Sequence, residues 1–410
     1  MEEIKSAKIT DYGYDGEGVC RVEGKVVFIP HTLEGEKVKI KMKEQRSSFC
    51  TAKVIEIEEK SPFRIAPPCP YYSKCGGCAY QHTTYENEVN IKTMLLRRQL
   101  DKAGYDGEIE VVPAPKCYAY RNKIRMFVGE RGLGLKEKKS SFICSVDNCM
   151  ITSEEINATI EKINTFILAG NHQRDYSEVV IRQEESTVLV NFFKRTKANI
   201  NYQGLFLMLG GNFGIFETYK NETTHKIGKK FMSCKEFGLE CHFSPLSFHQ
   251  VNDEVGQKLY QRVLDNLQGK NILNCYSGAG VLSGIMAVQG KRVVGVELGR
   301  AEHQDAEFLK DLNHLFFLTN IKGDCAAVLP KLEEKFDTVV IDPPRAGIAE
   351  KVVEALNNLK FKRLIYISCN SATLTRDLTR LKGLTFKKVM LFDMFARTGE
   401  YETVVVLDKK

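Results

Sequence analysis

From about residue 243 onward, short apolar runs alternate with amphipathic stretches, and this alternation constrains the fold more than any other feature of the chain. The runs have the length of buried strands, and the stretches between them have the period of helices. Strands and helices in this order form a doubly wound, mostly parallel α/β sheet, because each helix returns the chain to the start of the next strand. The expected strands are residues 271–275, 292–296, 316–321, 338–341 and 364–367, and the expected helices are residues 255–267, 281–288, 300–312 and 352–359.

The first 60 residues predict a different unit, a small closed β-barrel of OB type. Short runs rich in β-branched residues are separated by turns, and the corner at residues 11–18 contains three glycines. Strands at this spacing with Gly-rich corners are typical of such barrels. Many of these barrels bind nucleic acid, although others bind only protein.

The segment between these two units predicts a mixed α+β central domain. Four prolines between residues 62 and 70 form a stiff link after the barrel. Apolar periodicity then predicts helices at residues 86–103 and 153–168 among short strands. A chain of 410 residues is long enough for two or three domains. We therefore expect three, at residues 1–60, 61–240 and 241–410.

The composition and the first residues indicate the cellular compartment in which the chain is expected. No run approaches the roughly 18 apolar residues of a membrane span, and the first five residues, which include two glutamates and a lysine, are no secretory signal. The chain is therefore expected to be cytoplasmic and to have no membrane partner, and no feature implies an obligate protein partner. In a reducing compartment its 13 cysteines are expected to be thiols, metal ligands or catalysts rather than disulfides.

Positive charge is concentrated in one segment of the central region. Residues 92–139 carry 12 Lys/Arg against 6 Asp/Glu, whereas residues 1–60 are almost neutral. Arg121, Lys123 and Arg125 alternate within an apolar run, which would place three cations on one face of a strand. Such a face favours contact with a polyanion; a solvated charged surface is the alternative.

The loop after the first strand of the α/β unit predicts a nucleotide-like cofactor. Gly278 and Gly280 allow a tight turn and close approach of a ligand. The next strand ends in Glu297, where a carboxylate can accept hydrogen bonds from two ribose hydroxyls, and Asp324 follows the third strand and could hold an adenine amino group. The third glycine of a dinucleotide fingerprint is absent, so a phosphate would have no cradle. This favours S-adenosylmethionine over NAD.

Cys369 lies in the polar tripeptide Ser368-Cys369-Asn370 that follows the strand expected at 364–367, and it is the candidate nucleophile. The alternative is a packed core thiol. Asp342-Pro343-Pro344 resembles the signature of amino-group methyltransferases, but Arg345 stands where those enzymes need an aromatic residue and where RNA cytosine-5 enzymes have a cysteine.

What remains is attack of a thiolate on carbon 6 of a pyrimidine, methylation at carbon 5 and removal of the carbon 5 proton by a base. Glu400 and Glu402 are both candidates for the base, and their residue types alone do not decide between them.

Five motifs in a fixed order give the chain a resemblance to the RNA uridine-5-methyltransferases, a family acting on 23S ribosomal RNA and on transfer RNA. The resemblance implies a Rossmann-like methyltransferase domain, and the Gly-rich N-terminal region resembles a TRAM domain, an RNA-binding barrel. The motifs are Phe248-His249-Gln250-Val251-Asn252, Tyr276-Ser277-Gly278-Ala279-Gly280, Asp342-Pro343-Pro344-Arg345-Ala346-Gly347, Ser368-Cys369-Asn370 and Thr398-Gly399-Glu400-Tyr401-Glu402.

The resemblance implies a role for individual residues. It makes Cys369 the nucleophile and Glu402, not Glu400, the base. The S-adenosylmethionine contacts that it implies are Gln250, Tyr276, Glu297 and Asp342. Two positions depart from the family pattern. Val281 stands where Asn or Thr is frequent, and His249 stands where an apolar residue is expected and is itself expected to pack.

Three cysteines in the spacing C-x5-C-x2-C, at positions 69, 75 and 78, predict a metal site. The spacing alone allows zinc or an iron–sulfur cluster, or three unliganded thiols, although the second C-x-x-C usual in zinc ribbons is absent. The resemblance favours the second possibility, because a subset of the family holds a [4Fe–4S] cluster at this spacing. It implies Cys149 as the fourth ligand.

The same resemblance makes RNA the expected partner. Arg121, Lys123 and Arg125 would contact phosphate, and Phe248 could stack the extruded uridine. Members that act on transfer RNA often lack the barrel and the cysteines, so 23S ribosomal RNA is the first expectation and transfer RNA the second. A non-catalytic RNA-binding protein that has kept the fold is the alternative of a different class. The sequence does not indicate which uridine is modified.

Overall fold

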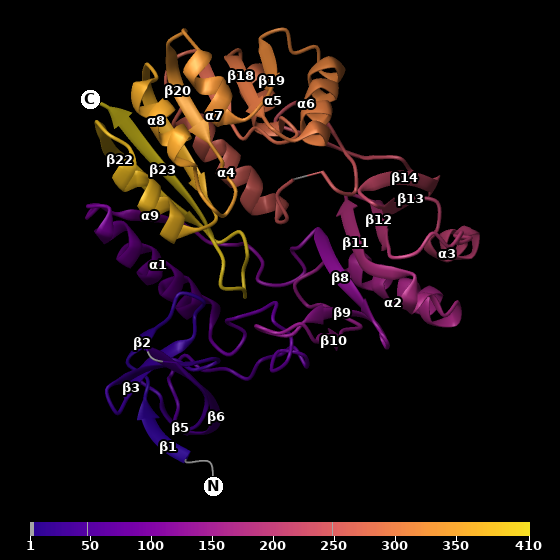
Figure 1. Ribbon diagram of the computed structural model, residues 1–410, viewed down its shortest axis with the longest axis vertical. Coiled ribbons are helices and arrows are strands. Elements are labelled where there is room, and N and C mark those ends of the chain that lie inside the picture. Colours follow the sequence, from indigo (N-terminus) through magenta and orange to yellow (C-terminus); the bar gives the residue numbers. More distant parts are fainter. Residues whose placement is uncertain (1–3, 47, 248) are drawn as a thin grey trace.

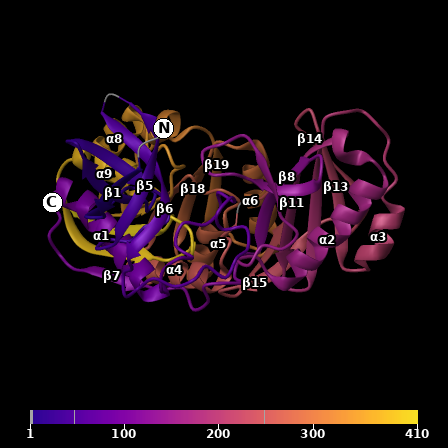
Figure 2. The same cartoon turned by 90° about the horizontal axis from the view of Figure 1, so that it is seen from below.

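The computed structural model describes residues 4–46, 48–247 and 249–410. A β-rich N-terminal unit lies at one end of the long axis and a large α/β unit at the other, with a second sheet beside them (Figure 1). Seen along that axis, β8 (Lys123–Gly129) and β13 (Phe213–Tyr219) lie toward one side of the molecule, and α1 (Tyr85–Lys102) and α9 (Ser371–Arg380) toward the other (Figure 2). Among the described residues, no helix is both long and apolar enough to cross a membrane.

The N-terminal unit is a six-stranded sheet in the order β1-β5-β6-β4-β3-β2. Alternate residues of its strands point inward, so Val27, Ile29, Val38 and Ile40 are fully buried. This arrangement confirms the small β-barrel that the sequence predicts. The strands are β1 (Ile4–Lys8), β2 (Asp11–Tyr12), β3 (Gly18–Val22), β4 (Lys25–Ile29), β5 (Lys37–Gln45) and β6 (Phe49–Glu59).

The central sheet has seven strands in the order β10-β9-β8-β11-β12-β13-β14. Helix α2 packs against it through isoleucines at positions 156, 160, 163 and 167, which recur every three or four residues and are fully buried. The strands are β8 (Lys123–Gly129), β9 (Gly132–Lys136), β10 (Ile143–Ser145), β11 (Tyr176–Glu184), β12 (Thr187–Lys194), β13 (Phe213–Tyr219) and β14 (Glu222–Gly228). The helices are α2 (Glu154–Ala169) and α3 (Gln203–Leu209), with a 3-10 turn, η1 (His172–Arg174).

The α/β unit is an eight-stranded sheet in the order β19-β18-β17-β20-β21-β23-β22-β7. The five strands from β19 to β21 are parallel, and β23 is antiparallel to β21 and β22. This confirms the doubly wound α/β fold. The strands are β7 (Ile109–Val112), β17 (Asn271–Cys275), β18 (Arg292–Glu297), β19 (Leu318–Lys322), β20 (Phe336–Ile341), β21 (Phe361–Ser368), β22 (Leu384–Phe392) and β23 (Glu402–Lys409).

Helices cover both faces of this sheet. One core contains residues of α4 (Asp253–Asp265), α5 (Val281–Val288) and α6 (Arg300–Leu312). The core on the opposite face contains residues of four helices. They are α1 (Tyr85–Lys102), α7 (Cys325–Val328), α8 (Glu350–Asn358) and α9 (Ser371–Arg380), and a 3-10 turn, η2 (Leu329–Lys331), follows α7.

The predicted limits of the central domain do not follow the packing. Helix α1 packs on α9, and β7 pairs with β22, so both belong to the α/β sheet although they precede the central sheet in the chain. The hairpin of β15 (Met232–Glu236) and β16 (Leu239–Phe243) spans the boundary expected at residue 240. Local sequence patterns do not reveal the pairing of β7 with β22, because these two strands are far apart in the chain.

The order of the parallel strands determines where a ligand can bind. The chain runs from β17 outward to β18 and β19, then returns to β20 on the other side of β17. The two crossovers therefore diverge above the carboxyl ends of β17 and β20, and open α/β sheets bind their ligands in the crevice formed at such a point.

A buried ion network holds the loop between β22 and β23, which reaches toward the N-terminal unit (Figure 1). The Lys92 ammonium on α1 donates to Glu88, to Asp393 at 2.7 Å and to the Phe395 carbonyl, and its side chain is fully buried. The Arg397 backbone amide donates to Glu88. These bonds fix the segment that leads into β23.

Candidate active site

The register of two antiparallel strands brings together the predicted nucleophile and one of the two predicted bases. Ser368, the last residue of β21, pairs with Thr403 of β23. Cys369, the residue that follows β21, therefore lies opposite Glu402, the first residue of β23. Strand β20 pairs with the other edge of β21, and Asp342 directly follows the last residue of β20. All three side chains lie at the carboxyl edge of the sheet.

Glu402 is a buried carboxyl and Asp342 a half-buried one, and both lie beside the thiol. Glu402 is 8% exposed, and within the described part of the chain its Oε2 has no hydrogen-bond partner. Burial raises the pKa of Glu402 well above its usual range, and Asp342 and Glu400 raise it further, while Arg345 opposes them. Burial also raises the pKa of Asp342 to about 7. A carboxyl in this environment has a high affinity for a proton.

Cys369 is only partly exposed, and its environment favours the thiol over the thiolate. Burial raises its pKa to about 11, the Glu402 carboxylate adds to this rise, and the nearby Arg345 guanidinium opposes it. Arg345 also forms an ion pair with Glu400. The two glutamates left open by the sequence thus have different surroundings: Glu402 is buried beside the thiol, whereas Glu400 contacts the arginine at the rim.

The N-terminal barrel contributes a residue to this edge. The Tyr14 hydroxyl donates to Asn370 Oδ1 at 2.7 Å, although the two residues are 356 positions apart. Asn370 follows Cys369 and caps α9, where its side chain accepts from the amides of Ala372 and Thr373. Tyr14 therefore contacts the residue that fixes the turn after the candidate nucleophile. The sequence contains no local signal for this contact.

The glycine loop and the end of β18 form one connected unit. The two carboxylate oxygens of Glu297 accept from the amides of Gly278 at 2.9 Å and Gly299 at 2.7 Å. Tyr276 and Gly278 both have positive φ, 60° and 55°, and a left-handed backbone at a non-glycine residue is typical of functional loops. A Cβ on Gly278 would meet no described atom within 4 Å, so the loop has open space on that side.

Two further predicted cofactor residues, Asp324 and Gln250, lie on segments outside the glycine loop. Asp324 is exposed, and one of its carboxylate oxygens accepts from the Ala326 amide to cap α7. Gln250 is buried on the segment that leads into α4, and its carbonyl accepts from Asn122. Val281, where the family pattern often has a polar residue, is the buried first residue of α5.

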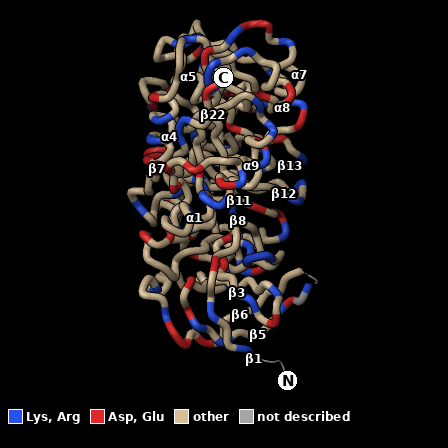
Figure 3. Tube along the Cα trace, turned by 90° about the vertical axis from the view of Figure 1, so that its left-hand side faces the viewer, with Lys and Arg blue, Asp and Glu red and all other residues tan. Residues whose placement is uncertain are grey.

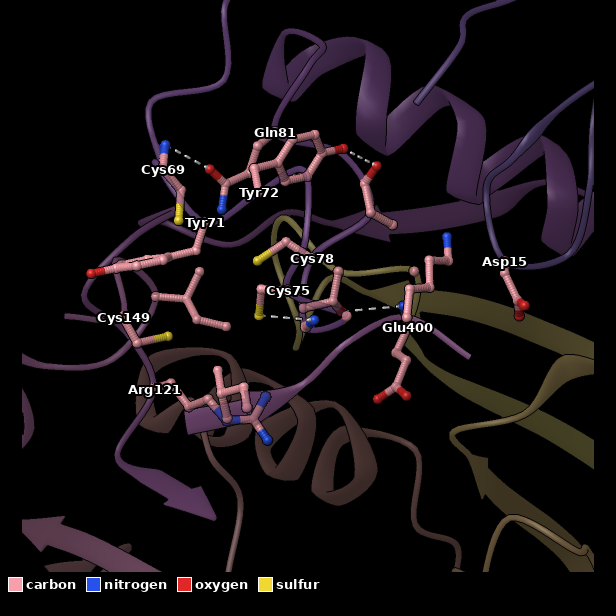
Figure 4. A pocket seen from close by; sticks show the side chains of 18 of the residues that line it. Asp15, Cys69, Tyr71, Tyr72, Cys75, Cys78, Gln81, Arg121, Cys149 and Glu400 are labelled. Carbon is pink, nitrogen blue, oxygen red and sulfur yellow. Dashed lines mark hydrogen bonds between the residues drawn. The ribbon is translucent and has the colours of Figure 1, made fainter. Parts of the chain in front are cut away.

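The predicted cysteine ligands line one cavity of about 570 Å³, together with Cys369, Tyr14 and Arg345. The sulfur atoms of Cys69, Cys75, Cys78 and Cys149 point toward a common region of this cavity (Figure 4). Burial raises the pKa of Cys75 to about 11 and of Cys78 to about 12, and it also raises the pKa of Cys149. The cysteines and the candidate nucleophile therefore share a cavity.

The three predicted RNA-binding cations lie close enough for the charges of Arg121 and Arg125 to act on Lys123, but only Lys123 and Arg125 belong to β8. Arg121 lies before β8 and forms an isolated bridge with Thr152. The Lys123 ammonium donates to a backbone carbonyl, and burial lowers its pKa to about 8. Arg125 is exposed but lies 3.3 Å from Glu178. Arg121 and Arg125 both line the cavity, whereas Phe248 lies outside the described residues.

Charge does not separate into a single basic face in the view of Figure 3. Lys and Arg positions are interspersed with Asp and Glu along the length of the molecule. The excess of positive charge in residues 92–139 is therefore partly paired with nearby acids, as Arg125 is with Glu178.

Family models match both ends of the chain. The model for the tRNA (uracil-5-)-methyltransferase family matches residues 330–410, which include Asp342, Cys369 and Glu402. The TRAM domain model matches residues 3–55, a range that includes strands β1 to β5 of the N-terminal barrel.

Similar proteins extend over almost the whole chain. An uncharacterized RNA methyltransferase of Caldanaerobacter subterraneus is 30% identical over 99% of each chain. The 23S rRNA (uracil(1939)-C(5))-methyltransferase RlmD of Francisella tularensis is 29% identical over 100% of this chain and 97% of its own.

A solved structure shares the fold and the domain arrangement. The crystal structure of Pyrococcus abyssi tRNA (uracil-54, C5)-methyltransferase in complex with S-adenosyl-L-homocysteine matches with a TM-score of 0.82 and 25% identity, over 98% of this chain and 100% of that one. The fold, the motif-bearing strand ends and the full-length relatives agree. The chain belongs to the family of S-adenosylmethionine-dependent RNA uracil-5-methyltransferases.

Proposed function

We propose that this enzyme methylates carbon 5 of a uridine in 23S ribosomal RNA through a covalent bond between Cys369 and carbon 6. The observation that carries the proposal is the register of β21 and β23, which sets Cys369 opposite Glu402 at the edge that also holds the glycine loop. A thiol, a buried carboxyl and a cofactor loop at one edge are the three parts that this chemistry requires.

The proposed reaction needs these residues and S-adenosylmethionine. The Cys369 thiolate adds to carbon 6, which breaks the double bond to carbon 5 and makes carbon 5 nucleophilic. Carbon 5 then takes the methyl group of S-adenosylmethionine, whose S–CH3 bond breaks so that S-adenosylhomocysteine leaves as a neutral thioether. The Glu402 carboxylate then removes the carbon 5 proton, the double bond re-forms, and the thiolate leaves. The high proton affinity of Glu402 suits it to this last step.

The cofactor is proposed to bind across the glycine loop. Glu297 already accepts from two loop amides, and its remaining lone pairs can accept from the ribose hydroxyls. Asp324 would hold the adenine amino group, and Gln250, Tyr276 and Asp342 would contact the rest of the cofactor. The family match and the complex of the related Pyrococcus enzyme with S-adenosyl-L-homocysteine support this assignment.

Replacing Glu297 by alanine should weaken S-adenosylhomocysteine binding by roughly 10- to 100-fold, because hydrogen bonds to a charged group contribute about 1.5–3 kcal/mol each. The change also leaves the Gly278 and Gly299 amides without their acceptor. Isothermal titration calorimetry measures the effect, with the surface variant Glu350→Gln as the control. Equal affinity in Glu297→Ala and the control would exclude Glu297 from the cofactor site.

The activity should rise with pH because the thiolate is the nucleophile. The pKa of Cys369 is raised to about 11, so only a small fraction is ionised near neutral pH. The value of kcat/KM, which reports the free enzyme, should therefore increase about tenfold per pH unit between pH 7 and 9. A flat profile over this range would contradict thiolate attack by a thiol with this pKa.

Arg345 is expected to stabilise the thiolate, because its charge opposes the rise in the Cys369 pKa. Arg345→Met should lower kcat/KM at pH 8 by about three- to tenfold and shift the pH profile upward; exposure of the guanidinium limits the size of the effect. Glu400→Gln, which removes only the ion-pair partner of Arg345, is the matched control. An unchanged profile in Arg345→Met would show that the guanidinium does not act on the thiol.

Ribosomal RNA is proposed as the substrate in preference to transfer RNA, because relatives named as 23S ribosomal RNA methyltransferases are 29% identical over the whole chain. The presence of the barrel does not distinguish a ribosomal RNA enzyme from a transfer RNA enzyme, since the Pyrococcus transfer RNA enzyme matches 98% of this chain. The test is methylation of 23S and transfer RNA transcripts with labelled S-adenosylmethionine under single-turnover conditions. Label in the 5-methyluridine of the 23S transcript supports the proposal, and label in transfer RNA alone overturns it.

The cavity with the four cysteines is proposed to hold a [4Fe–4S] cluster. A single zinc ion would hold its sulfur ligands about 3.8 Å apart, because the Zn–S distance is about 2.3 Å. No three cysteine sulfurs among the described residues lie within 4.8 Å of one another, which fits a larger group better. The cluster would be structural and would form part of the wall of the cavity that contains Cys369.

The cluster is tested by the colour and content of the protein purified without air. Wild type should be brown, absorb near about 400 nm and contain iron and sulfide. Cys149→Ser should lose the colour, whereas Cys144→Ser, which changes a nearby cysteine of β10 outside the set, should keep it. A colourless protein that contains zinc would refute the cluster.

A further inference from the structure

A second group of possible metal ligands lies where the central sheet meets the segment before α4. Glu184 is the last residue of β11, Glu236 the last of β15 and Asp253 the first of α4. His249 lies on the segment between β16 and α4. One ligand atom each of Glu184, His249 and Asp253 lie within 4.8 Å of one another. Glu236 Oε2 lies 4.0 Å from His249 Nε2.

The buried members of this group have polar atoms without partners. His249 is 4%, Glu236 5% and Glu184 8% exposed. Across the described ranges, the Nδ1 of His249 and the Oε2 atoms of Glu184 and Glu236 have no hydrogen-bond partner. A buried charge without a partner is costly, so a natural occupant of this space would supply positive charge.

The chain itself does not balance these carboxylates by direct contact. Among the described residues, no lysine or arginine nitrogen lies within 4.0 Å of a carboxylate oxygen of Glu184, Glu236 or Asp253. Arg182 faces the group from β11, but its Nη1 donates to the Ser247 carbonyl and its other nitrogens have no partner. The three carboxylates also outnumber the two cations, Arg182 and Lys123, whose charges act on His249.

We propose that Glu184, His249 and Asp253, with Glu236 as a fourth donor, bind one divalent transition-metal ion. One imidazole with several carboxylates suits Mn²⁺ or Zn²⁺, whereas Mg²⁺ and Ca²⁺ prefer ligand sets made only of oxygen. The Asn122 amide donates to Asp253 Oδ1 and would orient this ligand from the outer shell.

The proposed ion would link the central sheet to the methyltransferase unit. It would tie β11 and β15 to the segment that carries Gln250, which follows His249 directly. His249 stands where the family pattern has an apolar residue, so the site would distinguish this chain from relatives with that pattern. The ion would be structural, since the group does not line the cavity that contains Cys369.

The experiment measures Mn²⁺ binding to the full-length protein by electron paramagnetic resonance, through loss of the signal of free Mn²⁺. Wild type should bind one equivalent, and its melting temperature should rise with Mn²⁺ concentration. Glu184→Gln should weaken binding by more than roughly tenfold, because even outer-shell partners are worth 10- to 100-fold in affinity. Glu185→Gln, a change at the exposed neighbouring position, should bind like wild type.

Two further variants separate the explanations. His249→Leu restores the apolar residue of the family pattern, so it should fold and bind S-adenosylhomocysteine but lose Mn²⁺. Cys149→Ser should still bind Mn²⁺, because the cysteine cavity is a different site. Absence of stoichiometric binding to wild type, or equal binding in wild type, Glu184→Gln and His249→Leu, would overturn the proposal.

Discussion

Replacing Cys369 by alanine should abolish methyl transfer to RNA and leave S-adenosylhomocysteine binding unchanged. Deletion of a covalent nucleophile removes the whole pathway, so the single-turnover rate should fall by at least roughly 10⁴-fold. Without the thiolate, carbon 5 of uracil remains a poor nucleophile. The rate is measured by transfer of label from S-adenosylmethionine, and cofactor affinity by calorimetry.

The control for this substitution is Cys117→Ala, which removes another partly exposed thiol from outside the candidate site. It should retain a rate close to that of wild type. A Cys369→Ala enzyme with more than a few per cent of wild-type activity would contradict covalent catalysis, whatever its cofactor affinity.

Replacing Glu402 by glutamine should stop the reaction after methylation and trap the RNA on the protein. Glutamine has nearly the same shape but cannot take the carbon 5 proton, so the thiolate cannot leave. Turnover should fall by about 10²- to 10⁴-fold, the usual contribution of a general base. A band that survives denaturing electrophoresis and contains both labelled RNA and protein measures the trapped adduct.

Glu400→Gln separates the two carboxylates of this segment. Glu400 contacts Arg345 at the rim, whereas Glu402 is buried opposite Cys369. The Glu400 variant should therefore turn over without accumulating adduct. Accumulation of adduct in the Glu400 variant but not in the Glu402 variant would reverse the assignment of the base.

The sequence predicts the parallel part of the sheet well because its signals are local. The helix expected at residues 300–312 is α6, and the strand expected at 271–275 is β17, with the same bounds. In contrast, β22 carries two adjacent lysines and is half-exposed in its first residues, so its continuous apolar run covers only residues 389–392 and does not show where the strand begins. Strand β7 is missed because its partner, β22, is distant in the chain.

The site residues also differ in whether local sequence signals reveal them. Residue types and strand ends indicate Cys369 and the glycine loop, but the choice between two neighbouring glutamates depends on strand register and burial. The contact of Tyr14 with Asn370 joins residues of different units, so no local sequence pattern predicts it. His249 does stack on Phe243, as a packing residue would, yet the carboxylate of Glu236 faces its ring.

The most direct test of the central claim is mass spectrometry of the adduct trapped by Glu402→Gln. After nuclease and protease digestion, the peptide that contains Cys369 should carry one uridine whose mass includes one added methyl group. That result would place both the covalent bond and the methyl transfer on the proposed atoms. An adduct on another cysteine, or a Cys369 peptide that remains unmodified while methylated RNA accumulates, would contradict the account.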